Sequence, residues 1–96
     1  MNMQNLMAQA QKMQRDVLAK KEEINKQEFI GKTDLVEIIV MGDKTIKKVN
    51  FSKNISLDDM EIVEDMVTIA YNSALAEIEK ATEKALGQYG SLGGLI

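Results

Sequence analysis

The sequence lacks histidine, cysteine, tryptophan and proline altogether. Without histidine the commonest general base is missing, and without cysteine there is neither a thiol nucleophile nor a disulfide. Catalysis would have to rest on Ser, Thr, Lys or carboxylates alone, and no part of the sequence joins a nucleophile to a base. We therefore predict a protein that is not an enzyme and that uses no cofactor, metal ion or small-molecule substrate.

Long apolar runs are also missing. The longest uninterrupted one, from Ile38 to Met41, is far too short to span a bilayer, and no basic-then-apolar signal sequence opens the chain. At 96 residues the chain has room for one domain. We expect a cytoplasmic protein that has no membrane partner.

Charge is distributed unevenly along the chain. Residues 1–57 carry ten Lys and Arg against seven Asp and Glu, a balance of +3, whereas residues 58–96 carry two against eight, a balance of −6. Such asymmetry allows a local basic surface on a protein whose net charge is −3.

Residues 2–26 contain no glycine or proline and are rich in helix-forming residues, which predicts one long helix. Its apolar side chains recur with the a/d spacing of a helix-pairing seam, interrupted by Lys20. These apolar residues are Met3, Leu6, Ala10, Met13, Val17 and Ile24.

Three short segments rich in β-branched and aromatic residues follow this helix. Asp34 separates the first from the second, and Gly42 with Asp43 separates the second from the third, which predicts an antiparallel meander. The expected strands are residues 27–33, 35–41 and 44–51.

A second helix is predicted after the strands. Ser56 precedes Asp59 by three residues, the spacing of a helix N-cap with a capping-box acid. The helix should end near residue 86, because Gly87 follows it. The last ten residues, 87–96, contain four glycines and are predicted to be a flexible tail.

The lengths of these elements predict a homodimer. The two helices would be about 38 Å and 45 Å long, whereas a compact chain of this size has a radius of gyration of roughly 13 Å. The middle strand has apolar residues on both faces, and one face can pack on a helix while the other needs a partner. A two-fold pairing supplies that cover. The predicted interface residues are Leu6, Met13, Val17, Ile38 and Ile39.

Segments in a fixed order give the sequence a resemblance to a known family. They are the amide-rich helix around Leu6-Met7 and Lys12-Met13, the strand that Gly42 ends, the pair Lys47-Lys48 before Val49, and residues 63–67, 70–74 and 78–79. In this order they resemble the YbaB/EbfC family of bacterial nucleoid-associated proteins. The sequence departs from the family pattern at Ser52-Lys53, where Asp-Pro is usual, and at Ala8, where a basic residue is common.

The resemblance implies an α+β fold of order α-β-β-β-α, with a three-stranded antiparallel sheet and two long helices in two layers. Residues 1–86 would form a single YbaB-like domain and 87–96 the glycine-rich tail. It further implies a homodimer with protruding helical arms that binds double-stranded DNA in the nucleoid with limited sequence preference. The family's role also suggests effects on nucleoid organisation and gene expression.

Basic residues in two places are the candidate DNA contacts. Phosphate binding needs charge and shape but no aromatic platform, so the low aromatic content does not argue against duplex DNA. The alternative is that these lysines and arginines are ordinary solvated charges, or that the paired arms grip another protein as an adaptor would. The candidate DNA-binding residues are Lys12, Arg15, Lys20, Lys21, Lys47 and Lys48.

Overall fold

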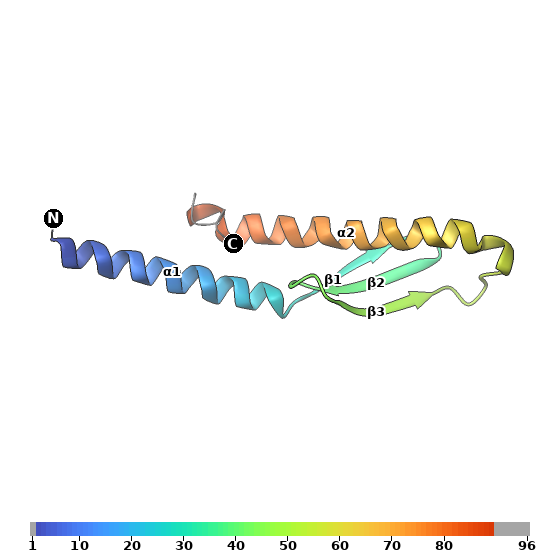
Figure 1. The fold of residues 1–96 in the computed structure, drawn as a ribbon, viewed down its shortest axis with the longest axis horizontal. Coiled ribbons are helices and arrows are strands. Elements are labelled where there is room, and N and C mark those ends of the chain that lie inside the picture. The colour runs from blue at the N-terminus through green and yellow to red at the C-terminus, as the bar shows by residue number, and fades with distance from the viewer. Residues whose placement is uncertain (1, 90–96) are drawn as a thin grey trace.

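The computed structural model describes residues 2–89 and has the predicted element order (Figure 1). A long helix leads into three antiparallel strands, and a second long helix follows after one turn of 3-10 helix. The elements are α1 (Met3–Asn25), β1 (Glu28–Lys32), β2 (Val36–Met41), β3 (Ile46–Phe51), the 3-10 turn η1 (Leu57–Asp59) and α2 (Met60–Leu86). The α+β fold is confirmed, and the helix and strand ends lie close to the expected ones.

The molecule is long and thin, because α1 extends away from the sheet instead of folding back over it (Figure 1). Its extents are 69 × 18 × 14 Å and its radius of gyration is 18.8 Å, against roughly 13 Å for a compact chain of this size. Asn2 caps α1, since its side-chain oxygen accepts a hydrogen bond from the Gln4 backbone N–H at 3.0 Å.

The sheet has the order β1-β2-β3, and α2 lies over β1 and β2. Alternate residues of β2, namely Val36, Ile38 and Val40, are buried beneath α2. Gly31 in β1 allows the closest approach of sheet and helix: a Cβ atom at this position would lie 1.7 Å from the backbone oxygen of Ala70. Beneath α2, the core is therefore made within one chain.

The turn from β2 to β3 is held by local hydrogen bonds. The Asp43 carboxylate accepts from the backbone N–H and the hydroxyl of Thr45, and these bonds hold the pKa of Asp43 below its usual value. Lys44 has a φ of 75°, in the left-handed region, and its carbonyl accepts a hydrogen bond from the Tyr71 hydroxyl at 3.0 Å. The turn is thereby tied to α2.

The entry into α2 confirms the predicted capping box in part. The Asp59 carboxylate accepts hydrogen bonds from the Ser56 N–H and hydroxyl, both at 3.1 Å. The helix ends at Leu86, one residue before Gly87, as expected. Residues 90–96 of the predicted tail lie outside the described residues, so the proposed domain and tail boundaries stay predictions. Among the described residues no helix is long and apolar enough to cross a membrane.

Candidate nucleic-acid interface

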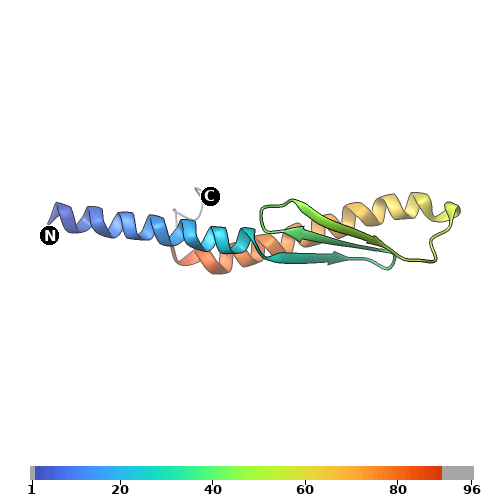
Figure 2. The same cartoon turned by 90° about the horizontal axis from the view of Figure 1, so that it is seen from below.

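The N-terminal part of α1 projects beyond the end of α2 (Figures 1 and 2). We call residues 3–16 the arm, because each of them is exposed. Val17 and Ile24, further along the same apolar seam, are each only 5% exposed, where α1 packs beside the C-terminal part of α2. Nearer the tip, Met13, Leu6 and Met3 are 39%, 42% and 73% exposed. The apolar seam is thus covered by α2 only at Val17 and Ile24, and it continues uncovered to the tip of the arm.

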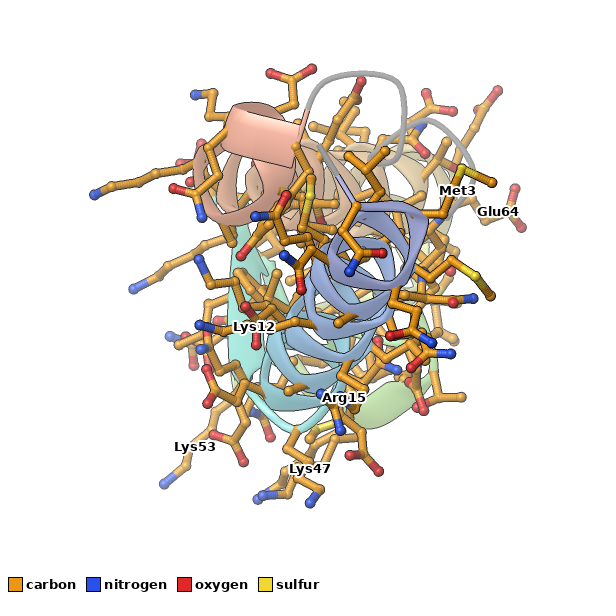
Figure 3. All side chains as sticks on the ribbon, turned by 90° about the vertical axis from the view of Figure 1, so that its left-hand side faces the viewer. Met3, Lys12, Arg15, Lys47, Lys53 and Glu64 are labelled. Carbon is orange, nitrogen blue, oxygen red and sulfur yellow. The ribbon has the colours of Figure 1, made fainter. Side chains whose placement is uncertain are left out.

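The basic side chains at the base of the arm share a side with the strand lysines. Seen from the tip of α1, Arg15, Lys47 and Lys53 point away from α2, and Lys12 points sideways (Figure 3). Met3 and Glu64 lie on the opposite side of the same view. The two groups of candidates therefore lie on one side of the molecule, at different points along its length.

The other two candidates on α1 face α2 instead. The Lys20 amine lies 5.2 Å from the centre of the Tyr89 ring, a cation-π distance. Lys21 is half-buried and lines an open groove of about 650 Å³ with Glu79 and Glu83 of α2. Both lysines face other parts of the same chain, whereas Arg15 and Lys47 point away from α2.

On β3 the two candidate lysines differ in their surroundings. The pairing with β2 shifts between Ile39, opposite Lys48, and Val40, opposite Ile46, so Lys47 is the extra residue of a β-bulge. Its amine makes an ion pair with Glu28 of β1. Lys48 is exposed and lies opposite Ile39 on the sheet face turned away from α2.

The predicted dimer residues are spread over three environments. Leu6 and Met13 are exposed on the arm, and Val17 is buried where α1 meets α2. Ile38 is fully buried in the core at 0% exposure, whereas Ile39 is half-buried on the other face of the sheet. The structure does not test their role in an interface, but it separates core from surface.

Sequence reasoning left two features out of the candidate set. Lys53, just after β3, points to the same side as Arg15 and Lys47 (Figure 3). On β3, Ile46, Val49 and Phe51 are 51%, 37% and 53% exposed, although their strand partners on β2 are buried. The alternation of β2 predicts buried residues, but only the position of α2 over β1 and β2 reveals that β3 is left uncovered.

The charge on this side of the molecule favours a polyanionic ligand. Within residues 2–89 no group of acidic side chains is placed to hold a metal ion, and no buried side-chain polar atom lacks a hydrogen-bond partner. Exposed cations on one side of an elongated molecule suit a long polyanion such as duplex DNA, because its phosphates repeat along its length.

Comparison with known proteins identifies related chains. Residues 1–94 match the YbaB/EbfC DNA-binding family. The chain is 46% identical over 92 residues to a nucleoid-associated protein of Lactococcus lactis subsp. cremoris (strain MG1363), covering 93% of each chain. It is 42% identical over 92 residues to a nucleoid-associated protein of Streptococcus uberis, again covering 93% of each, and 40% identical over 91 residues to one of Enterococcus faecalis, covering 92% of this chain and 88% of that protein.

Proposed function

The chain belongs to the YbaB/EbfC DNA-binding family, and from that premise we propose that it binds double-stranded DNA as a homodimer, mainly through phosphate contacts. The proposal includes limited sequence preference, because contacts to phosphates carry no direct sequence information. The family and the names of the relatives describe DNA association and no catalysis, in agreement with the prediction of a protein that is not an enzyme.

One observation carries this proposal: the common orientation of basic side chains from the arm and from β3 (Figure 3). Arg15 and Lys47 come from separate elements, yet both point away from α2, which bears the cluster of acids near its N-terminus. Duplex DNA running along this side would meet cations from the arm to the sheet while staying clear of those carboxylates. Lys12, Arg15 and one strand lysine give about three phosphate contacts per chain.

The homodimer is supported by apolar surface that one chain leaves uncovered. Ile46, Val49 and Phe51 form an exposed row on β3, beside the core that α2 covers. Ile30, 54% exposed, and Ile39 are neighbours on the opposite face of the sheet. Exposed apolar side chains grouped in this way mark an interaction site in a soluble protein. The two groups lie on opposite faces of the sheet, so a self-complementary contact with a second copy would cover one of them.

Two-fold symmetry would also double the DNA contacts. A dimer carries two arms and two sets of lysines, so about three contacts per chain become roughly six per dimer. Two arms on one dimer can engage separate stretches of the duplex, which is how we propose that the protein affects nucleoid organisation and gene expression in the cytoplasm.

The test is a titration of random-sequence duplex DNA at 50 and 200 mM salt. With roughly six phosphate contacts, wild-type affinity should fall about a thousandfold between these concentrations. The Lys12→Ala, Arg15→Ala double variant loses about four contacts per dimer, so its fall should be only about tenfold. Both residues are exposed and lie off the buried seam, so the melting temperature should stay unchanged.

The matched control is Lys80→Ala, Lys84→Ala, which removes the same charge from α2. It should keep the wild-type salt dependence. If the arm variant binds normally and Lys47→Ala, Lys48→Ala fails, the strand rather than the arm holds the duplex. If wild-type protein does not bind duplex at low salt and instead retains another protein, the adaptor function replaces the proposed one.

A further inference from the structure

One face of the arm carries amide side chains in the place of charges. Gln4, Ala8, Gln11 and Arg15 follow one another at spacings of four, three and four residues, so they lie in one row along the helix. All four are exposed. No side chain from Asn2 to Gln11 is charged, and the first cations, Lys12 and Arg15, come at the base of the arm. The row therefore runs from amides at the tip to a cation at the base.

The amides of this row are uncommitted within residues 2–89. No hydrogen bond engages the side chain of Gln4 or Gln11 there, whereas Asn2 caps the helix and Asn50 of β3 donates to the Glu37 carboxylate at 3.3 Å. The apolar seam occupies another side of the arm, where Met3 points away from Arg15 (Figure 3). The row is thus free of both helix capping and apolar packing.

The chemistry of the row matches one base pair better than the other. A glutamine amide offers a donor and an acceptor side by side, the complement of adenine N7 and N6 in the major groove. Guanine is read there mostly by arginine or lysine, which residues 2–11 lack. The Ala8 methyl group between the two glutamines suits contact with the thymine methyl.

We propose that the arm enters the major groove and reads A·T base pairs through Gln4 and Gln11, with Ala8 against thymine. The inference rests on the proposed DNA-binding function and adds base readout to it. With two amides per chain the readout covers few base pairs, in keeping with a limited sequence preference.

The dimensions of the arm agree with this placement. A helix with its side chains is about 10–12 Å across, and the major groove is about 12 Å wide and 8.5 Å deep. The charge-free residues 2–11 span about 15 Å along the helix axis. With the helix lying along the groove, Gln4 and Gln11 are about 10 Å apart, roughly three base-pair steps, so both amides face bases, while Lys12 and Arg15 lie beyond them and would reach phosphates.

The experiment measures fluorescence anisotropy with labelled duplexes of equal length, one of mixed A·T sequence and one of mixed G·C sequence. Because phosphate number is the same, a difference in affinity reports base readout. The full-length wild-type protein should prefer the A·T duplex by roughly tenfold, the value of one good amide-adenine pair. Replacing adenine by 7-deazaadenine removes N7 without changing charge or pairing, and should abolish the preference.

A minor-groove substitution separates the two grooves. Replacing adenine by 2,6-diaminopurine adds an amino group in the minor groove and leaves the adenine N7 and N6 pattern of the major groove in place. Wild-type affinity for this duplex should stay within about twofold of that for the adenine duplex. A larger loss would move the contact to the minor groove and overturn the proposal.

Variants assign the readout to the row. In the Gln4→Ala, Gln11→Ala double variant, the affinities for the A·T and G·C duplexes should differ by less than about twofold. The matched control Gln9→Ala, Gln14→Ala removes two amides of the same arm that lie off the row, and should keep the preference. Ala8→Lys should raise affinity for both duplexes at low salt and reduce the preference, because a new phosphate contact carries no base information.

The outcomes distinguish this inference from the function on which it rests. If wild-type protein binds neither duplex, the DNA-binding proposal itself fails. If it binds both equally, with a steep dependence on salt, phosphate binding stands and base readout is wrong. If the preference exists but survives in Gln4→Ala, Gln11→Ala, the row does not carry it.

Discussion

The arm and the rest of the chain, which we call the body, differ in what surrounds their side chains. In the body, alternate residues of β2 are buried under α2, and Gly31 lets the backbones of β1 and α2 meet. On the arm, the apolar seam of α1 continues from Val17 to Met13 and Leu6, but the exposed fraction of these side chains rises from 5% to 39% and 42%. A regular apolar pattern is present in both regions, and only one of them is covered.

This difference shows that contacts within one chain account for the residues of the body but not for those of the arm. Residues of the body are explained by contacts within one chain, since the core cluster joins β2 to α2. Residues of the arm have no such explanation within the described chain. The apolar side of an exposed amphipathic helix indicates that the helix binds a partner. The partners proposed for the arm are a second copy of the chain and duplex DNA.

The largest effect should come from a charge placed in the covered core of the body. Ile38→Asp puts a carboxylate at a position with 0% exposure, so we expect a loss of about 4–5 kcal/mol in the free energy of unfolding, close to the whole stability of a small domain. Urea denaturation followed by circular dichroism measures it. A cooperative transition at the wild-type midpoint would contradict the assignment of Ile38 to the core.

Ile39→Asp is the matched change one residue along β2, on the half-buried opposite face. It should leave the chain folded but lower its mass in solution from twice 10.7 kDa to the monomer value, measured by light scattering at micromolar concentration. A wild-type protein that is itself monomeric would overturn the dimer. A dimeric Ile39→Asp protein would move the interface to another surface, of which the uncovered row on β3 is the first to test.

A smaller effect should follow from adding one methyl group where β1 meets α2. A Cβ atom at residue 31 would lie 1.7 Å from the Ala70 oxygen and 3.0 Å from the Ala74 nitrogen, so backbones must separate. We expect Gly31→Ala to cost about 3 kcal/mol, at the upper end of overpacking in a well-packed core. Thermal unfolding measures the change.

The control for this change is Gly87→Ala, at a helical residue with nothing within 4 Å of the added atom. It should be neutral or slightly stabilising, by about 0.5 kcal/mol, because alanine restricts the unfolded chain. Equal stability of the two variants would show that α2 does not press on β1 at Gly31.

Most of the fold could be predicted because it depends on local signals. Helix formers without glycine or proline mark α1, a glycine at position 42 marks the turn between strands, and Ser56 with Asp59 marks the start of the second helix. Each of these signals acts over a few residues, so no knowledge of distant contacts was needed.

The candidate site was less predictable because it depends on which side each residue faces. Lys12, Arg15, Lys20 and Lys21 have similar sequence surroundings, yet Lys20 lies against Tyr89 and Lys21 against the groove beside α2. Tyr89 is 69 residues away in the chain, and α2 covers two strands of three. Contacts between residues so far apart in the chain produce no pattern in the sequence around the lysines that would indicate which side each one faces.

The smallest effect concerns the strand lysine whose charge is already engaged. Glu28 pairs with Lys47 across the sheet, and the two side chains are 45% and 56% exposed, so the pair adds little to stability. On duplex DNA the carboxylate competes with a phosphate for the same amine and repels the backbone nearby. Glu28→Gln should therefore raise affinity by roughly two- to fivefold at 50 mM salt and steepen the salt dependence, by up to about two contacts per dimer, with an unchanged melting temperature.

Glu77→Gln is the control, because Glu77 pairs with Lys80 at 3.5 Å on α2 and its loss changes net charge equally. If both variants gain the same affinity, the effect is one of net charge alone; a gain confined to Glu28→Gln places Lys47 on the DNA and extends the binding surface from the arm into the body.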